Sequence, residues 1–274
     1  MIAQLESHAP AAPVAAVVYG AGMTAFIAVG AATSGIAIRR LADALVWPLN
    51  LAAEAWLLKT ALSARGLIDA GRAVETRVAA GDLDGARSAV AALVSRDPTA
   101  LDAELLVSAV VESLAENTAD SIVAPLLAYA LGGLPAAFAY RAINTLDAMI
   151  GYHGRYEYLG KTAARLDDLA NLLPSRLAAG LLLAGGALAG GQVHAGWICL
   201  AAQHGRTESP NAGWPMSVMA GLLGIVLEKP GHYRLGDPAH PPDLPAIDHA
   251  AEIVNAATLL AGLSALAVAW IRRA

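Results

Sequence analysis

Three acidic residues recur at four-residue spacing in the segment 107–120. On a helix, Glu112, Glu116 and Asp120 would share one face. The opposite face is apolar and consists of Val107, Val110, Val111 and Leu114. Like charges at this spacing repel unless the face is solvated or a cation lies against it. The segment therefore predicts either a solvated acidic face or a cation site.

A guanidinium, an amide and a carboxylate follow one another in the segment 140–158. Arg141, Asn144 and Asp147 are three residues apart, so neighbours in the series can touch along a helix that Gly151 is expected to end. One interpretation is a buried Arg–Asp pair that holds a helix at the membrane edge. The other is a guanidinium that meets phosphate or carboxylate, because its planar fork suits both. The spacing leaves both interpretations open.

Two adjacent carboxylates lie among basic residues farther along the chain. Arg165 and Asp168 are three apart, and Asp167 and Asn171 are four apart, so each pair can meet on a helix. Beside Lys161 and Arg165, the two carboxylates could hold Mg²⁺ and a polyphosphate. A structural lattice of ion pairs is the alternative, and the spacing does not separate the two.

A fourth polar segment, 204–215, is a loop fixed by prolines and glycine, of the kind that often carries function. Asn211 offers hydrogen bonds there, and His204 and Glu208 could pair or bind a metal ion. The seven histidines are scattered, so we expect no transition metal bound by the protein. The chain contains no GxxxxGK[ST], no GxGxxG after a strand and no GxSxG.

Long uncharged windows must position these segments. Three windows are long enough to span a membrane, namely Val14–Ile38, Leu177–Ala202 and Ile253–Ile271. Ser121–Tyr140 is uncharged but interrupted by proline and glycine, and it predicts a kinked span, a re-entrant pair or a buried hairpin. We interpret Leu41–Leu58 as an amphipathic or interfacial helix. The windows predict three to five membrane segments.

Polar helices are expected between the windows. Leu58–Arg96 predicts two helices joined by a turn at residues 81–85, and Pro98 follows a break and is expected to begin the next helix. The stretch 230–245 predicts a loop. No segment alternates with period two, so we expect no sheet. The glycines of Gly186-Ala-Leu-Ala-Gly190 either permit close helix packing or reflect a Gly-rich and Ala-rich composition.

The predicted fold class is all-α, a polytopic integral membrane protein with polar helices between its membrane segments. Residues 1–40 are expected to form an N-terminal transmembrane segment and residues 250–274 a C-terminal one. Residues 41–249 are expected to form a catalytic helical region that includes membrane segments near 121–140 and 177–202.

Composition agrees with this class. Of 274 residues, 57% are hydrophobic and 15% are charged, against roughly 25% charged in ordinary soluble domains. A net charge of -5 leaves no basic footprint for nucleic acid, and one cysteine excludes an internal disulfide. Residues 1–13 carry no Lys or Arg, which argues against a signal peptide. The basic pairs Arg39-Arg40 and Arg272-Arg273 predict cytoplasmic ends.

Several segments, in order, resemble one family. They read VESLAENTADSIVAPL, AYRAINTLDAMIGY, ARLDDLANLLPSRL and SPNAGWP, with EAWLLKTALSARGL and GIVLEKPGHYRLGD as further similar stretches. They are similar to the adenosylcobinamide-phosphate synthases of cobalamin biosynthesis, the CobD/CbiB family. The resemblance covers roughly Leu51 to the C-terminus.

This resemblance implies a multi-pass enzyme of the cell (inner) membrane whose active site faces the cytoplasm. Such acid–amine ligases form a C–N bond between the propionate carboxylate of adenosylcobyric acid and (R)-1-amino-2-propanol or its O-phosphate. They use ATP and Mg²⁺, and adenosylcobinamide or its phosphate is the product. Other membrane-bound enzymes of cobalamin assembly are expected partners, besides the lipid bilayer, and nucleic acid is not.

The expected route is phosphorylation of the carboxylate by ATP and attack of the amine on the acyl phosphate, which needs cations, metal ligands and a base. Within this implied activity, the residues expected to be catalytic are Glu112, Glu116, Asp147 and Asp168. Those expected near Mg²⁺ are Glu112, Glu116, Asp120, Asp167 and Asp168. Those expected to bind substrate or phosphate are Arg141, Asn144, Lys161, Arg165, Asn211 and Trp214. Asp147 and Asn211 are further expected to orient the substrate.

Residues 1–50 depart from the family pattern. Members usually begin with about one more apolar segment, with Gly-Asp-Pro and His-Pro-Val elements that are not found in residues 1–50. We expect either a misassigned start or a missing segment. Two alternatives are a non-catalytic AmpE-like membrane sensor or scaffold, and a small transporter. The first leaves the clustered polar motifs unexplained, and the second does not suit charges that lie mostly between the windows.

Overall fold

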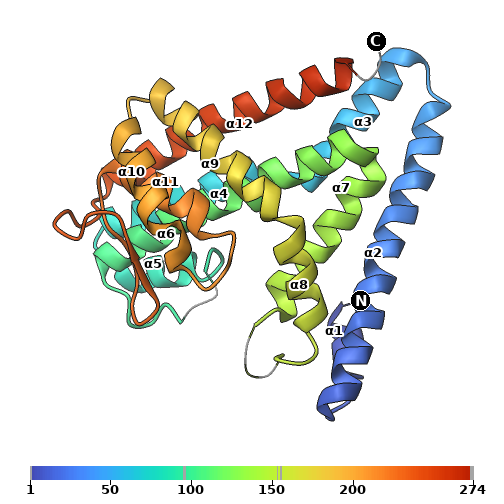
Figure 1. The fold of residues 1–274 in the computed structure, drawn as a ribbon, viewed down its shortest axis with the longest axis horizontal. Helices are drawn as coiled ribbons and strands as arrows, with labels where there is room; N and C mark the ends of the chain where they lie inside the picture. The colour runs from blue at the N-terminus through green and yellow to red at the C-terminus, as the bar shows by residue number, and fades with distance from the viewer. Residues whose placement is uncertain (1, 95–96, 153, 155, 272–274) are drawn as a thin grey trace. The chain divides into compact units, whose positions relative to one another are not determined.

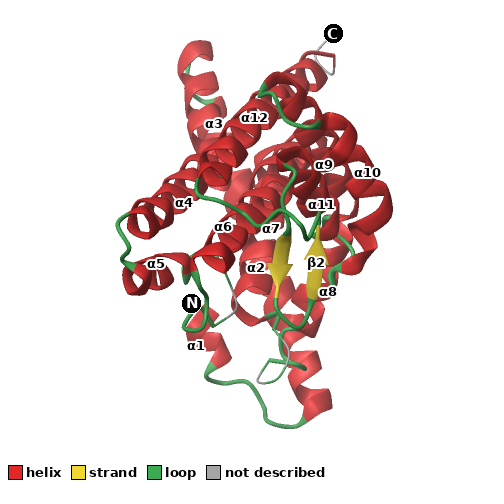
Figure 2. Cartoon of the chain, turned by 90° about the vertical axis from the view of Figure 1, so that its left-hand side faces the viewer, coloured by secondary structure: helices red, strands yellow, loops and turns green. Residues whose placement is uncertain are grey.

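The computed structural model describes residues 2–94, 97–152, 154 and 156–271, and these fold almost wholly into helices (Figures 1 and 2). The chain divides into two compact units, each built from two separate stretches. The first unit comprises Met1–Leu62 and Ala124–Asn171, and the second Ser63–Val123 and Leu172–Ala274. The predicted helical class is confirmed.

The first unit is a small helical bundle. Its helices are α1 (Ile2–Glu6), α2 (Pro13–Asp43), α3 (Trp47–Ala61), α7 (Ala124–Ile150) and α8 (Lys161–Ala170). Helix α2 packs along α7, α8 packs against both, and α3 packs against α7. The buried cluster that joins them contains Met23, Ile27, Leu146, Ile150, Leu159 and Ala163. This core fixes the face of α7 that carries the polar segment.

Glycines on α2 let its backbone approach its neighbours closely. A Cβ at Gly20 would meet the carbonyl oxygen of Leu159, and one at Gly35 would lie 2.8 Å from the Cα of Pro135. The two sites lie about four helical turns apart on one helix. Glycine at both is therefore a condition of the α2 packing.

Helix α7 is kinked where the sequence predicts an interruption. Gly133 has φ 69° and ψ -161°, and Pro135 follows it. Among the three outcomes expected for Ser121–Tyr140, the structure gives a bent helix, preceded by the π-helical turn η1 (Ala119–Val123). Gly151 ends α7 as predicted, with its N–H donating to the carbonyl of Asp147 at 2.7 Å.

Helix α3 begins later than the window Leu41–Leu58, because a break at residues 44–46 separates it from α2. Trp47, Leu49 and Trp56 are exposed, and of its 15 residues only Ala61 is buried. Large apolar side chains on a largely uncovered helix are typical of contact with lipid.

The second unit surrounds two buried helices. Its elements are α4 (Ala64–Ala79), α5 (Leu83–Val90), α6 (Ala103–Thr118), η1, α9 (Leu172–Leu188), α10 (Val193–Gln203), the 3₁₀ turn η2 (His204–Arg206), α11 (Gly213–Leu223), β1 (Leu227–Lys229), β2 (Tyr233–Leu235) and α12 (Pro245–Ile271). Helix α11 packs against α6, α9, α10 and α12, and 11 of the 16 residues of α6 and 9 of the 11 residues of α11 are buried. On the predicted polar face of α6, Glu112 is therefore enclosed, whereas Glu116 is half-buried.

The prediction of one helix over Leu177–Ala202 is wrong. Helix α9 ends at Leu188 and α10 starts at Val193, because Gly190 adopts φ 80° and turns the chain. The two glycines of the GxxxG element also differ in role. A Cβ at Gly186 would strike Leu222, whereas one at Gly190 would meet nothing within 4 Å. Gly186 therefore serves packing and Gly190 the turn.

The prediction that the chain has no sheet is also wrong, whereas the predicted loop over 230–245 is confirmed except for β2 and for Pro245, which begins α12. Strands β1 and β2 form an antiparallel hairpin, in which Glu228 faces Arg234 and Leu227 faces Leu235 (Figure 2). Both leucines are fully buried. Strands of three residues are too short to show alternation in the sequence.

Aspartate side chains cap the N-termini of helices α5 and α6. The turn predicted at residues 81–85 is confirmed at Gly81 and Asp82 and is shorter than predicted, because α5 begins at Leu83. Asp82 caps α5 by accepting from the N–H of Gly85 at 2.9 Å. This backbone donor lowers the pKa of Asp82. Pro98 does not begin the next helix, because Asp102 caps α6 through the N–H of Leu105. Arg96, at the predicted break, lies outside the described residues.

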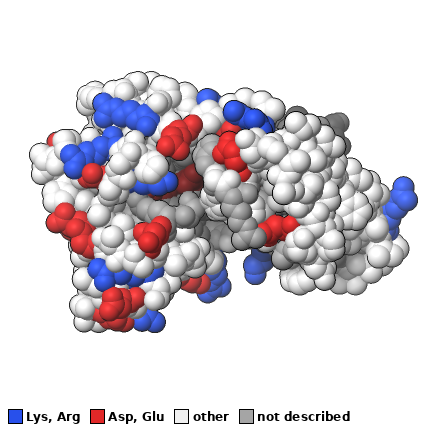
Figure 3. Space-filling view, turned by 90° about the horizontal axis from the view of Figure 1, so that it is seen from below, with Lys and Arg blue, Asp and Glu red and all other residues white. Residues whose placement is uncertain are grey.

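Among the residues that the structure describes, three helical stretches are long and apolar enough to cross a membrane. They are Pro13–Asp43, Ala103–Ile150 and Pro245–Val268, and the bent pair Lys161–Ala170 and Leu172–Leu188 makes a fourth if it counts as one span. Figure 3 shows broad uncharged surfaces beside surfaces where acidic and basic side chains are interspersed. On α2, Val14 and Phe26 are 79% and 64% exposed, which suits lipid. The predicted Arg272-Arg273 pair lies outside the described residues.

The α2 packing gives a direct test. Replacing Gly35 with Ala should lower the free energy of unfolding by about 1–3 kcal/mol, because the new methyl group overlaps the backbone at Pro135. Gly30 is on the same helix and a Cβ there meets nothing within 4 Å, so Gly30→Ala should be neutral or stabilising by up to about 1 kcal/mol. Thermal unfolding in detergent measures both, and equal effects would contradict the packing.

Candidate functional site

In the first unit, a chain of hydrogen bonds joins α7 to α8. Arg141 Nη1 donates to Asn144 Oδ1 at 3.1 Å, and Asn144 Nδ2 donates to Asp167 Oδ1 at 3.2 Å. Asn171 Nδ2 donates to Asp167 Oδ2 at 2.9 Å, and the hydroxyl of Tyr140 donates to Asn171 Oδ1 at 2.8 Å. Five polar side chains from two of the singled-out segments therefore form one network.

Asp167 is the buried centre of this network, with 8% of the residue exposed. A buried carboxylate needs donors, and the two amides supply one to each oxygen. The predicted contacts Arg141–Asn144 and Asp167–Asn171 are confirmed. The contact between Asn144 and Asp167 was not predicted, because it joins residues 23 apart in the chain.

Lys161, Arg165, Asp168 and Asp147 of the first unit are each exposed or half-buried. Arg165 is 3.8 Å from Asp168, as its spacing predicts, but the side chain of Arg165 is 76% exposed. Lys161 is exposed at the start of α8. Asp147 is half-buried in the last turn of α7, where a Cβ on Gly151 would meet its carboxylate. The side chains of Lys161 and Arg165 are accessible to a phosphate-bearing ligand.

In the second unit, Glu112 is buried with 5% exposed, so the solvated-face interpretation is wrong for this residue. The hydroxyl of Ser108 donates to Oε1 at 2.7 Å and that of Tyr233 donates to Oε2 at 2.7 Å. Ser108 Oγ also accepts from the N–H of Glu228 at 2.8 Å. Glu112 thus ties α6 to both strands of the hairpin.

Glu116 and Asp120 are half-buried, and Asp120 lies in the π-helical turn η1 rather than in regular α-helix. Within the described part of the chain, no three His, Cys, Asp or Glu residues lie together in a way that could hold a metal ion. Mg²⁺ commonly needs only one or two carboxylates when substrate phosphates complete its shell. Glu116 and Asp120 offer two carboxylates, a number and type that suit Mg²⁺ when phosphates complete its shell.

The loop before α11 gathers a second cluster around Asn211, which is 6% exposed. Arg176 Nη1 and the hydroxyl of Ser175 donate to Asn211 Oδ1 at 3.1 and 3.3 Å. The guanidinium carbon of Arg176 lies 4.5 Å from the ring centre of Trp214, and the His204 ring lies 4.4 Å from the same indole. An arginine from α9 and an imidazole from η2 therefore meet on one aromatic side chain of α11.

The His204–Glu208 pair is not formed. Glu208 pairs with His232 at 2.9 Å, and His204 Nδ1 is 2.9 Å from the carbonyl oxygen of Leu200. A carbonyl only accepts, so Nδ1 of His204 carries the hydrogen and, in the neutral ring, Nε2 keeps a lone pair. The spacing of four residues failed because His204 begins the 3₁₀ turn and residue 208 lies beyond its end.

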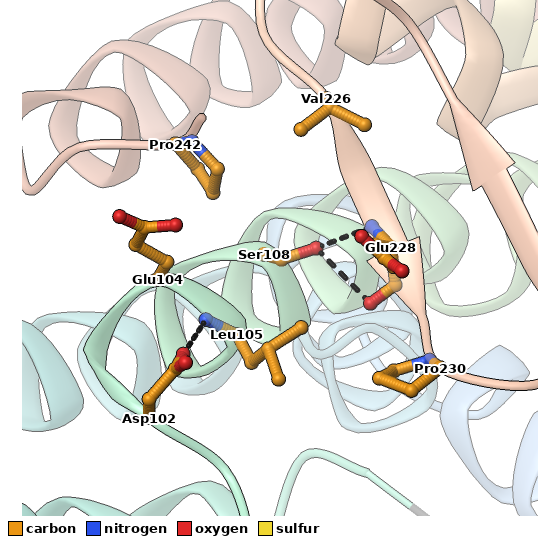
Figure 4. Close-up of a pocket in the computed structure, with 8 residues that line it drawn as sticks. All are labelled: Asp102, Glu104, Leu105, Ser108, Val226, Glu228, Pro230 and Pro242. Carbon is orange, nitrogen blue, oxygen red and sulfur yellow. Dashed lines mark hydrogen bonds between the residues drawn. The ribbon is translucent and has the colours of Figure 1, made fainter. Parts of the chain in front are cut away.

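A hollow of about 190 Å³ lies where the hairpin meets α6 (Figure 4). It is lined by Asp102, Glu104, Leu105, Ser108, Val226, Glu228, Pro230 and Pro242. Two of its three carboxylates have structural partners, because Asp102 caps α6 and Glu228 pairs with Arg234 at 2.7 Å. Its charge suits a cation rather than a phosphate.

Two residues that join these clusters were not predicted from helical spacing. Arg176 and Tyr233 lie within the segments ARLDDLANLLPSRL and GIVLEKPGHYRLGD, but no helical spacing relates them to a partner. Arg176 meets Asn211 across 35 residues, and Tyr233 meets Glu112 across 121. The one feature of the sequence that pointed to these two residues was their position in segments that resemble the family.

Comparisons with known proteins agree with the resemblance. A family model described as CobD/Cbib protein matches residues 1–260. The chain belongs to the CobD/CbiB family. The match extends beyond the predicted range, which began near Leu51, and it covers both units. Members of this family take part in cobalamin biosynthesis.

Curated relatives carry matching names. The cobalamin biosynthesis protein CobD of Dehalococcoides mccartyi strain CBDB1 is 43% identical over 188 residues, or 69% of this chain and 61% of the relative. The probable cobalamin biosynthesis protein CobD of Methanocaldococcus jannaschii is 45% identical over 193 residues, or 70% and 63%. That of Methanothermobacter thermautotrophicus is 40% identical over 223 residues, or 81% and 74%. The alignments thus span slightly less than two thirds of the first two relatives. No solved structure matches the chain.

The network around Asp167 predicts a contrast between neighbours. Asp167→Ala should lower the free energy of unfolding by about 1–3 kcal/mol for each amide left without its acceptor. Asp168→Ala should change it by less than about 1 kcal/mol, because its ion pair is largely exposed. Thermal unfolding of both variants measures the difference. Equal losses would show that Asp167 is not the centre of the network.

Proposed function

We propose that the chain catalyses ATP-dependent amide formation between the propionate carboxylate of adenosylcobyric acid and (R)-1-amino-2-propanol or its O-phosphate. The observation that carries the proposal is family membership. It is supported by the hydrogen bonds that bring family-like segments together, since Arg176 meets Asn211 and Glu112 meets Tyr233. These contacts hold polar groups at fixed positions inside an otherwise apolar protein.

The chemistry explains which groups are needed. A carboxylate and an ammonium do not condense at neutral pH without activation. In the proposed route, a carboxylate oxygen attacks the γ-phosphorus of ATP and the bond to the bridging oxygen breaks, which releases ADP. The free amine then attacks the acyl carbon, and the carbon–oxygen bond to phosphate breaks. The products are the amide, ADP, inorganic phosphate and one proton.

The residues present divide among these tasks. We assign the cations Arg141, Lys161 and Arg165 to phosphate oxygens, and of these Lys161 and Arg165 are exposed. We assign Glu116 and Asp120 to Mg²⁺, which supplies charge neutralisation for the phosphates when it is bound. We also propose that five further side chains contact or orient the substrates, namely Asp147, Asp168, Asn144, Asn211 and Trp214.

Two predicted metal ligands receive other tasks in this proposal. Glu112 and Asp167 are both buried, and each carboxylate oxygen accepts a hydrogen bond from a side chain. We assign Glu112 to holding the hairpin and Asp167 to holding α7 against α8.

The side of the membrane on which the active site lies follows from the same proposal. ATP is a cytoplasmic substrate, and the basic pair Arg39-Arg40 near the end of α2 favours a cytoplasmic end for that helix. We therefore place the site on the cytoplasmic side of the cell membrane, and other membrane-bound enzymes of cobalamin assembly are the expected partners.

An isotope experiment tests the route. The 274-residue chain, purified in nanodiscs, would be incubated with cobyric acid labelled with ¹⁸O in its propionate carboxylate, aminopropanol phosphate, ATP and Mg²⁺. We expect amide and ADP in equal amounts, with one ¹⁸O per inorganic phosphate, because the carboxylate oxygen leaves with phosphate. Free aminopropanol in a parallel reaction identifies the preferred amine.

The outcomes separate cleanly. Amide formed without ¹⁸O in phosphate would contradict the acyl phosphate. Labelled AMP in place of labelled phosphate would point to adenylation of the carboxylate. No amide from a folded chain would contradict the proposed function.

A further inference from the structure

Arg176 is a half-buried arginine in the first turns of α9 whose hydrogen bonds all leave from one nitrogen. Its Nη1 donates to the carbonyl of Leu172 at 2.7 Å, to Ser175 Oγ at 3.0 Å and to Asn211 Oδ1 at 3.1 Å. No partner is found among the described residues for Nε or Nη2. These two nitrogens form the side of the guanidinium that binds a carboxylate or phosphate through two parallel hydrogen bonds.

The guanidinium is held in place before any ligand arrives. Three acceptors fix Nη1, and the face of Trp214 lies 4.5 Å from the guanidinium carbon. Trp214 itself is placed by the loop, where its N–H donates to the carbonyl of Asn211 at 3.2 Å. A fixed arginine loses less side-chain freedom when it binds, which favours tight recognition.

The charge of Arg176 also lacks a counter-ion in the described structure. All 23 Asp and Glu residues of the chain are described, and none forms an ion pair with it. Five other arginines do have carboxylate partners, namely Arg72, Arg77, Arg87, Arg165 and Arg234. In a chain with a net charge of -5, a restrained and half-buried arginine without an acidic partner marks a place for an external anion.

We propose that Arg176 binds an oxyanion of a substrate through Nε and Nη2, with Trp214 and Asn211 holding the guanidinium in position. This inference rests on the proposed function, whose substrates supply such groups. The shared chemistry is a carboxylate or phosphate with two oxygens in the guanidinium plane. The sources are the propionate of the corrinoid, the phosphates of ATP and the phosphate of the amino alcohol.

Binding measurements on the full chain in nanodiscs distinguish these sources. Equilibrium dialysis with ATP, cobyric acid and aminopropanol phosphate, each alone, would give the Kd of wild type, Arg176→Lys and Arg176→Gln. We expect Arg176→Gln to weaken one of the three ligands about 10- to 100-fold and to leave the others within about threefold. Arg176→Lys should weaken the same ligand less, because it keeps the charge but loses the fork.

Two controls keep the test specific. Arg77→Lys changes an arginine of the same unit that pairs with Asp82, and it should alter no Kd. Trp214→Phe keeps an aromatic face under the guanidinium and should weaken the same ligand only a few-fold. If Arg176→Gln fails to fold, Arg176→Lys and Trp214→Phe still give the ligand-specific pattern.

The readout separates the two proposals. Arg176-dependent binding of one ligand without amide formation would overturn the proposed function and keep the oxyanion site. Amide formation with unchanged Kd values in the Arg176 variants would overturn the oxyanion site alone. Equal weakening of all three ligands would indicate a structural role, and no binding by wild type would also overturn the inference.

Discussion

Buried carboxylates are the constraint on which the rest of this structure depends. Each of the two units is an apolar helical body that encloses one acidic side chain, Glu112 in one and Asp167 in the other. A carboxylate in such surroundings is costly unless donors reach its oxygens. In both units the donors come from other parts of the fold: the Tyr233 hydroxyl reaches Glu112 from the hairpin, and the Asn144 amide reaches Asp167 from α7. Satisfying the carboxylate therefore fixes segments that are distant in the chain.

This constraint connects the fold to the proposed chemistry. Amide formation from a carboxylate needs phosphate-binding cations at defined positions, and positions are defined when side chains are held on more than one side. Arg141 lies in the Asp167 network, and Arg176 is held by Asn211 and Trp214. Small residues also help to hold these side chains in position, because Gly20 and Gly35 let α2 lie close to the elements that carry the Asp167 network.

Sequence reasoning recovered what depends on local spacing. The helical class, the apolar windows at α2 and α12, the kink before Pro135 and the contact of Arg141 with Asn144 all follow from neighbours in sequence. It failed where a few residues or a distant partner decide the outcome. Gly190 divides the window Leu177–Ala202, and three-residue strands are too short to show a period. Helical spacing leaves a solvated face and a cation site both open for Glu112, because it shows which residues share a face but not what covers that face.

The most direct test of this account is a double-mutant cycle between Glu112 and Tyr233. Unfolding free energies would be measured for wild type, Glu112→Gln, Tyr233→Phe and the double variant, with Tyr158→Phe as a control, because no hydrogen-bond partner of its hydroxyl is found among the described residues. If the buried hydrogen bond ties α6 to the hairpin, the two changes should be coupled by about 1–3 kcal/mol. Losses that simply add would contradict the claim that the buried carboxylate organises this unit.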